Sequence, residues 1–470
     1  MSASHSSEKM TRTEKRATVG LAGVYGLRMF GLFIILPVFA FYAEHVPGGN
    51  NYTLVGIALG AYGLTQAILQ IPMGWLSDRI GRKPVIYAGL TLFALGSFIA
   101  AFATDIYWVI FGRIIQGAGA ISAAVMALAA DLTREEHRTK AMATIGMTIG
   151  VVFALSLAVA PALNQWIGVP GIFAMTGILA LTAMLVVKKF IPDPRISRFH
   201  SDTETSTTSL RSVLTNTQLL RLDYGIFALH ATLMALWLVV PLNLREAGIA
   251  IDQHWKIYLP VLFFSMLLII PAIIFGEKKA KLKQVFVAAI ALLLCGQIAL
   301  AMTAGSIWGI AFALLIFFMA FNLLEASLPS LISKIAPVGA KGTAISAYSS
   351  TQFLGAFAGA AMGGYLMEHY DSYALFMFCG SLLLAWLIMA YTMKAPAAVR
   401  SKMYHVPDMD IEKSKHLSQQ LAGLSGVHEA LVLADEKVAF LKVDMKGFDE
   451  AGVTKLLEEE KEEKTDGISQ

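Results

Sequence analysis

Long apolar stretches recur about twelve times along this chain, and they constrain its fold more than any other feature. A helix that crosses a bilayer needs about 20 predominantly apolar residues. Only 15% of the 470 residues are charged, whereas a typical soluble domain carries about 25%. The low charge extends over most of the chain, which indicates a multi-span membrane protein. We predict spans near residues 17–45, 52–77, 83–104, 106–131, 139–165, 168–191, 219–246, 255–276, 284–303, 306–333, 342–367 and 372–393.

Positive charge alternates between successive loops. Short loops that carry Lys and Arg stay on the cytoplasmic side of a membrane. Only the loop after span seven breaks the alternation, with Arg245 and, near the membrane edge, Lys256. The pattern predicts twelve spans with both termini in the cytoplasm. The basic segments contain Lys9, Arg12, Lys15 and Arg16; Arg79, Arg82 and Lys83; Arg134, Arg138 and Lys140; Lys188, Lys189, Arg195 and Arg198; Lys278, Lys279, Lys281 and Lys283; and Lys334 and Lys341.

The longest polar interruption divides the spans into two groups of six. It is rich in Ser and Thr, and it predicts a cytoplasmic linker. Arg138-Thr139-Lys140-Ala141 before span five and Lys341-Gly342-Thr343-Ala344 before span eleven give weak internal symmetry. Two related halves with a binding site between them are typical of secondary transporters. We predict a cytoplasmic tail at 1–16, six-helix halves at 17–191 and 218–393, the linker at 192–217, and a cytoplasmic domain at 400–470.

The region after the last span is charged and amphipathic. Residues 403–406 predict a short strand, and Leu417, Leu421 and Leu424 follow helical spacing. Apolar runs at 427–433 and 438–443 flank a short polar turn, which indicates a hairpin. A second helix around 453–457 completes a small α+β domain, and a partly ordered tail is the alternative. Three roles are open for this region: sensing an ion or small ligand, self-association, or only adding mass at the cytoplasmic face.

The charged segment at 74–84 connects the second and third predicted spans. We expect the first helix to end near Leu76 and the next to start near Lys83. Gly74 permits close helix approach, and Gly81 permits a tight turn. One acidic and three basic side chains lie between these helices, so the segment is expected to matter for more than solubility.

The 74–84 segment resembles the signature of the major facilitator superfamily through Gly74, Leu76, Asp78, Arg79, Gly81, Arg82, Lys83 and Pro84. Span four carries a second pattern of this superfamily, Arg113-x-x-Gln116-Gly117-x-Gly119-Ala120. The antiporter motif of span five is matched only in part, since Ala160-Pro161 stands where Gly-Pro is usual. The resemblance covers residues 17–393. It implies an all-α, twelve-span fold in a bacterial inner membrane, and the added C-terminal domain resembles a ferredoxin-like fold.

The resemblance also implies a conformational switch. It places Asp78 against the start of span eleven, near Gly342 and Thr343, where free N–H groups and the helix dipole favour an anion. Asp131, Arg134 and Arg138 supply further charges nearby. This contact, which we call the latch, would favour the outward-open state. The alternative is a charge cluster that only fixes topology.

Four ionisable residues inside the spans are candidates for proton coupling, because charges within a membrane are costly and usually face a cavity. Arg28 lies in the middle of span one, and the family pattern links Arg113 to proton coupling. His230 in span seven is titratable near neutral pH. Each has a structural alternative: the arginines pair with a carbonyl or carboxylate, and the histidine is only hydrogen-bonded.

Glu325 in span ten is the leading proton-carrier candidate. Asn322, three residues before it, shares its helix face. Pro329 removes the helical hydrogen bond to the carbonyl of Glu325 and can kink the helix there. Burial of the carboxylate resists ionisation and favours proton exchange near neutral pH. The alternative is a salt bridge to a fixed cation such as Arg28.

Six polar side chains in the spans are candidates to line a central substrate cavity. Interhelical packing bonds are an equally good explanation for each of them. They are Tyr25, Tyr62, Gln66, Gln70, Asn322 and Gln352.

These patterns predict a secondary transporter that exports a small, amphipathic or drug-like compound in exchange for protons. Proton-linked or facilitative uptake and a membrane sensor acting through the C-terminal domain are alternatives. The expected partners are the solute, protons and lipid, without nucleic acid. A monomer is expected, with self-association through the C-terminal domain as an option.

Other classes lack sequence support. No Walker phosphate loop is present, and no nucleophile triad or metal-ligand cluster stands out, so we expect no enzyme, metal or cofactor. Cys295 and Cys379 fall within spans and imply neither a disulfide nor a metal site. The first apolar stretch is far longer than the apolar core of a cleavable signal peptide.

Overall fold

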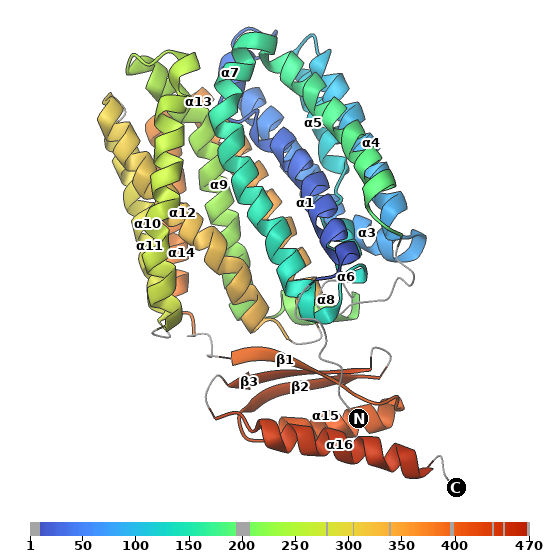
Figure 1. Cartoon of the computed structure of the whole chain (residues 1–470). Coiled ribbons are helices and arrows are strands. Elements are labelled where there is room, and N and C mark those ends of the chain that lie inside the picture. Colours follow the sequence, from blue (N-terminus) through green and yellow to red (C-terminus); the bar gives the residue numbers. More distant parts are fainter. Residues whose placement is uncertain are drawn as a thin grey trace.

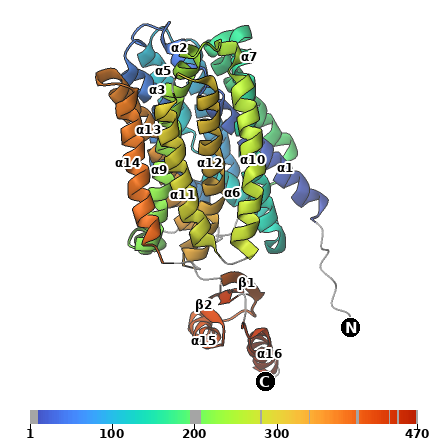
Figure 2. The same cartoon turned by 90° about the vertical axis from the view of Figure 1, so that its left-hand side faces the viewer.

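A large helical bundle with a small α+β domain at one end makes up the computed structural model (Figure 1). It describes residues 10–193, 207–278, 281–303, 305–337, 340–394, 399–434, 437–444 and 447–467. We call the end of the bundle next to the small domain the domain-side end, and the opposite end the far end. Figure 2, turned by 90°, shows the long helices running between these two ends.

The N-terminal half contains the first six passes through the bundle. Its first pass is interrupted between two helices at 34–38, where Pro37 lacks a backbone N–H. Its last helix reverses direction at the far end, where Gly168 has φ +65°. The helices are α1 (Arg12–Phe33), α2 (Phe39–Ala43), α3 (Tyr52–Ile80), α4 (Arg82–Ala101), α5 (Ile106–Ala118), α6 (Ser122–Asp131) and α7 (Glu135–Phe190).

The C-terminal half supplies the other six passes. The predicted linker at 192–217 is described only in part, since 194–206 lie outside the described residues, and it includes the short helix α8 (Thr207–Leu214). The elements that follow are α9 (Thr217–Glu246), the 3₁₀ turn η1 (Ile251–Gln253), α10 (Trp255–Lys278), α11 (Leu282–Met302), α12 (Ile307–Ile335), α13 (Lys341–His369) and α14 (Ser372–Tyr391).

Nine helical segments of the described chain are long and apolar enough to cross a membrane. One of them, at 140–190, contains the reversal at Gly168 and therefore makes two passes. The interrupted first pass and α13, which is rich in Gly, Ala and Ser, are not among the nine. These two pack against α7 and α3, respectively, inside the bundle. Together these passes give the predicted twelve-span fold.

The structure corrects two predicted boundaries. The 74–84 segment is mostly helix and not a loop, because α3 continues to Ile80 and only Gly81 separates it from α4. Span four is not one helix: α5 and α6 are separated at 119–121, within the second family pattern. Close packing explains this break, since a Cβ atom on Gly119 would lie 2.3 Å from the carbonyl oxygen of Gly89 in α4.

The C-terminal domain folds as predicted, with a strand, a helix, a hairpin and a second helix. The antiparallel sheet has the order β1-β3-β2, and Val432, Leu441 and Val443 lie buried in its core. Three strands with two helices fit a ferredoxin-like domain, whose last strand is absent from the described residues. The elements are β1 (Val399–His405), α15 (Ile411–Ala422), β2 (Val427–Leu433), β3 (Val438–Asp444) and α16 (Glu450–Gly467).

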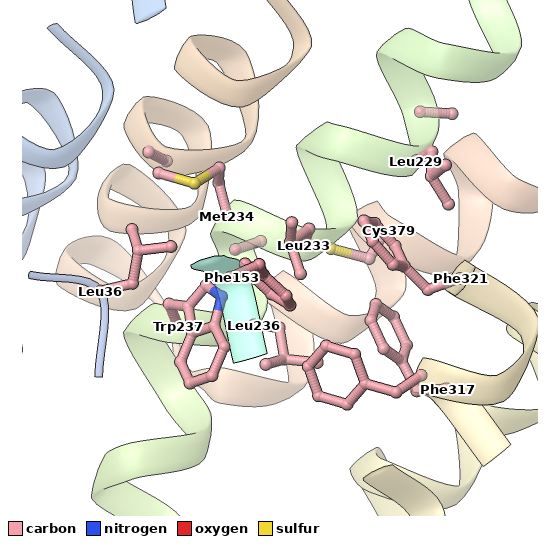
Figure 3. Packing of buried hydrophobic residues seen from close by; sticks show 14 of the residues in the cluster. Leu36, Phe153, Leu229, Leu233, Met234, Leu236, Trp237, Phe317, Phe321 and Cys379 are labelled. Atoms are coloured by element: carbon pink, nitrogen blue, oxygen red, sulfur yellow. The ribbon is translucent and has the colours of Figure 1, made fainter. Parts of the chain in front are cut away.

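One hydrophobic cluster joins the two halves of the bundle. Figure 3 shows Leu36 and Phe153 of the N-terminal half close to Trp237 of α9. The Phe153 ring lies 6.2 Å from Phe318 of α12, and Phe318 lies 6.3 Å from Trp237. The halves therefore share a packed core in this conformation.

Candidate functional site

The 74–84 segment forms an ion-pair network at the domain-side end. Gly81 has φ +98°, a conformation that favours glycine, and α4 begins at the next residue. The side chain of Arg82, 2% exposed, bonds to Asp78 in α3 and lies 3.3 Å from Asp131 Oδ2 at the end of α6. Arg82 also donates to Ser77 Oγ at 3.0 Å. One buried guanidinium therefore joins the ends of α3, α4 and α6.

The other charges of the predicted switch contact different partners. The Arg79 guanidinium lies 3.5 Å from the centre of the Trp75 ring. Lys83 donates to the carbonyl of Ile191 at 2.7 Å, after the last helix of the N-terminal half. Arg138 is buried. Gly74 lies close to α6, where a Cβ atom on it would be 3.0 Å from Ala123 Cβ. Asp78 accepts a hydrogen bond from Arg82, which belongs to the same half.

Arg134 connects this network to the first helix. It bonds to Glu14 through its side chain and its backbone N–H, both at 2.9 Å. Glu14 also completes a capping box with Thr11, so α1 begins at Arg12, inside the predicted tail at 1–16.

The Glu14 contacts hold throughout the physiological pH range. Burial acts to raise the pKa of the Glu14 carboxyl, but hydrogen bonds from Arg134 and Thr11 outweigh it and lower the pKa from 4.5 to about 2. A carboxyl group whose pKa is lower in the folded protein than in the unfolded chain stabilises the fold at pH values above the unfolded pKa. This stabilisation is lost as the pH falls through the folded pKa.

Glu325 lies at the meeting point of three helices of the C-terminal half. Gln352 of α13 donates to Glu325 Oε1 at 3.2 Å and lies 2.8 Å from Nε2 of His230 in α9. His230 Nε2 is 3.9 Å from Glu325 Oε2, which has no hydrogen-bond partner among the described residues. The Glu325 side chain as a whole is 37% exposed, although Oε2 is buried.

The structure separates Asn322 from this group. Asn322 shares a helix with Glu325, but its amide donates to Ser265 Oγ in α10 at 3.0 Å. That bond supports the packing explanation for Asn322. The alternative salt bridge between Glu325 and Arg28 is not among the ion pairs of the described residues, since Glu325 faces His230 and Gln352.

A second polar group lies in the N-terminal half. Arg28, which is 2% exposed, bonds to Gln66 and lies 3.5 Å from Ser122 Oγ. Tyr25 donates to the same hydroxyl at 3.0 Å. Gln66 donates to Gln70 at 2.7 Å, one turn further along α3. Four predicted site residues therefore form one hydrogen-bonded group.

Arg113 is held by hydrogen bonds to neighbouring helices, which supports the structural alternative for this residue. Its guanidinium donates to the carbonyls of Ala58 and Leu59 in α3, at 3.4 and 3.2 Å, and to Gln116 at 2.9 Å. Gln116 donates onward to Ser97 of α4 at 2.7 Å. The second family pattern thus holds α5 against α3 and α4 by hydrogen bonds.

Two polar contacts join the two halves at the far end. Arg245, at the end of α9, forms a bidentate pair with Glu44 beside α2, at 2.8 and 2.9 Å. The Tyr52 N–H donates to Glu368 of α13 at 2.6 Å. We call these two contacts the far-end clasp. They explain why Arg245 breaks the charge alternation, because its partner is an acid across the interface.

Sequence reasoning missed three polar residues at these sites. Asp223 of α9 and Tyr348 of α13 are buried, and Asp223 Oδ1 and the Tyr348 hydroxyl have no hydrogen-bond partner among the described residues. An acidic residue inside span seven was a usable signal for Asp223. Ser122, which joins Tyr25 to Arg28, carried no such signal because serine is common in membrane helices.

This arrangement, with two six-pass helical halves and polar groups buried inside the bundle, is that of a membrane transporter. The sequence profile of the Major Facilitator Superfamily matches residues 21–360. The chain belongs to this superfamily.

Individual relatives agree with that assignment. The chain is 42% identical to the inner membrane transport protein YajR of Escherichia coli (strain K12), over 93% of this chain and 96% of that protein. It is 33% identical to the class H tetracycline resistance protein of Pasteurella multocida, over 32% of this chain and 38% of that protein. The human organic anion transporter MFSD10 (TETRAN) superposes with a TM-score of 0.61 at 18% identity, covering 81% of this chain and all of that one, which shows the fold alone.

Several predictions are confirmed by these comparisons. The chain is a membrane transporter and not an enzyme, and it is a multi-pass protein, whereas its location in the inner membrane stays a prediction.

Proposed function

We propose that the protein is a proton-coupled secondary transporter that exports a small amphipathic or drug-like compound by alternating access. The observation that carries this proposal is the Glu325 group. A partly exposed glutamate side chain that accepts from Gln352 and lies beside His230 inside a membrane bundle is placed to gain and lose a proton. Similarity of one third of the chain to a tetracycline resistance protein supports export of a drug-like solute.

Charge alternation supports an orientation with both termini in the cytoplasm, which makes the far end periplasmic. In that orientation the present conformation faces inward, because the far-end clasp joins the halves on the periplasmic side. A glycine contact adds to the closure: a Cβ atom on Gly56 of α3 would lie 2.1 Å from the carbonyl oxygen of Ala360 in α13. The latch would then form when the halves tilt the other way.

Flux measurements separate this function from its alternatives. Purified full-length protein in proteoliposomes is expected to move a solute outward against its gradient when protons move inward. Solute that moves in the same direction as the protons, or solute flux that does not depend on a proton gradient, would favour the uptake carrier. Absence of net flux for every solute in a broad library would favour the sensor.

Asp78→Asn is expected to shift the protein towards the inward-open state, because the amide is a weaker partner for the start of α13 than the carboxylate. Arg82 keeps Asp131 as a partner, so the fold is expected to survive. Accessibility labelling of cysteines placed at the domain-side end measures the shift. Glu412→Gln is the matched control, since Glu412 is an exposed acid of α15, outside the 74–84 segment. Equal labelling of Asp78→Asn and wild type would remove the latch from the mechanism.

We also propose that the C-terminal domain acts on the transporter through α12, the helix that carries Glu325. Lys442 of β3, with its side chain 9% exposed, donates to the carbonyl of Ala336 at the end of α12 and lies 3.4 Å from Glu429. A cation at a helix C-terminus is favoured by the helix dipole.

Lys442→Met is expected to loosen this contact and speed hydrogen exchange of the last turn of α12 several-fold. Lys437→Met is the control, since Lys437 is also on the domain but pairs with Asp408 within it, at 3.3 Å. Exchange that is the same in both variants would mean that the domain does not hold α12. Transport by a chain truncated after residue 394 tests whether this contact regulates flux.

A further inference from the structure

We propose that Arg28 binds the acidic group of an amphipathic organic anion, so that the transported solutes include compounds of this class. Transport of such an anion rests on the proposed transport function, whereas its binding does not. The binding itself can be measured without transport.

Arg28 is a buried positive charge without an acidic partner among the described residues. It contacts Gln66, Ser122 and the Tyr62 ring, whose centre lies 5.6 Å from the guanidinium. Its Nε atom is buried and has no hydrogen-bond partner among those residues. Removing a charge from water without a counterion is costly, so a ligand that supplies a carboxylate or similar anion would stabilise this site.

Arg113, in the same half of the bundle, differs from Arg28 in its partners. It is equally buried, but it donates to two fixed backbone carbonyls and to Gln116. Helix carbonyls cannot turn away, whereas the Gln66 amide and the Ser122 hydroxyl can rotate. Arg28 is therefore held by partners that an incoming anion can displace. A guanidinium offers a planar pair of donors that matches a carboxylate.

The surroundings of Arg28 fit an apolar body beside the acidic group. The Tyr62 ring lies under Arg28, and Phe353 of α13 lies 6.3 Å from Tyr62 at the interface of the two halves. A Cβ atom on Gly63 would be 2.7 Å from the carbonyl oxygen of Phe353, so α13 packs closely over this region. When α13 moves away from α3, the site between Tyr62 and Phe353 opens towards the solute.

The test uses two fluorescent probes with the same naphthyl-alkyl body, one ending in a carboxylate and the other in a trimethylammonium group. Binding to the full chain in lipid nanodiscs is followed by fluorescence anisotropy, with empty nanodiscs as the control for partition into lipid. The wild type is expected to bind the carboxylate probe more tightly than the cationic one. Arg28→Gln is expected to weaken the carboxylate probe at least tenfold and to leave the cationic probe unchanged or tighter.

Two further variants keep the test decisive. Arg28→Lys retains the charge without the planar fork, and it is expected to give an intermediate loss. Arg221→Gln is the control, because Arg221 donates to the carbonyl of Met389, at 3.4 Å, away from this site. Equal binding of the carboxylate probe by wild type, Arg28→Gln and Arg28→Lys, or a preference of the wild type for the cationic probe, would overturn the proposal. These outcomes are independent of proton coupling, which is tested separately at Glu325.

Discussion

Glu325→Gln is expected to abolish pH-driven transport while leaving solute counterflow intact. Glutamine preserves the size of the side chain and can still bond to Gln352, but it cannot exchange a proton. Counterflow needs only that the loaded carrier changes state, and this step does not require net proton movement. The expected result is a loss of gradient-driven flux to the level of empty liposomes.

The measurement compares two modes in the same proteoliposomes, flux driven by a pH gradient and exchange of labelled for unlabelled solute without one. Glu246→Gln is the matched control, because Glu246 is an exposed acid at the far end of α9, outside the Glu325 group. Gradient-driven flux that is unchanged in Glu325→Gln would remove this residue from coupling. Loss of both modes would assign Glu325 to solute binding or to the fold.

The sequence predicted single residues better than it predicted their partners. An acid in an apolar stretch marks Glu325 because membrane charges are rare. Neither periodicity nor charge, however, shows that His230, Glu325 and Gln352 meet, since they lie on three helices whose relative rotation depends on packing. Spacing placed Asn322 on the helix face of Glu325 but could not show that its amide bonds to Ser265 on α10.

Helix ends were the least predictable part of the fold. Charges between 74 and 84 suggested a loop, but Asp78 and Arg82 are one helical turn apart and bond across Gly81. The break between α5 and α6 arises from contact between the Gly119 and Gly89 backbones, which belong to different helices. Arg245 looked like an exception to the charge rule until its pair with Glu44, 201 residues away, accounted for it.

Gly56→Leu is expected to hold the far end of the bundle open. Because a Cβ atom at Gly56 would lie 2.1 Å from the carbonyl oxygen of Ala360 and 3.0 Å from Gly364 Cα, a larger side chain prevents this closure of α3 on α13. Overpacking a close contact costs about 1–3 kcal/mol or more, and each 1.4 kcal/mol changes an equilibrium about tenfold. The closed population is therefore expected to fall by about one to two orders of magnitude.

Spin labels at Asn50 and Tyr370, both exposed at the far end, report the separation of the halves in lipid. Cys295 and Cys379 are first replaced by Ala. Gly56→Leu is expected to move the distance distribution to longer values and to suppress net transport, with little change in thermal unfolding. Gly23→Leu is the control, because a Cβ atom there has nothing within 4 Å. An unchanged distribution in Gly56→Leu would show that the α3–α13 contact does not control this gate.

The comparison with Gly359 separates an effect on the gate from an effect on folding. A Cβ atom on Gly359 would lie 2.0 Å from the carbonyl oxygen of Ala231 in α9, so this contact lies within the C-terminal half. Gly359→Leu is therefore expected to lower the thermal unfolding temperature. Gly56→Leu meets its obstacle between the halves, where a rigid-body movement can relieve it. If both variants lose stability equally and neither changes the label distances, the two contacts are equivalent packing and the far end is not a moving gate.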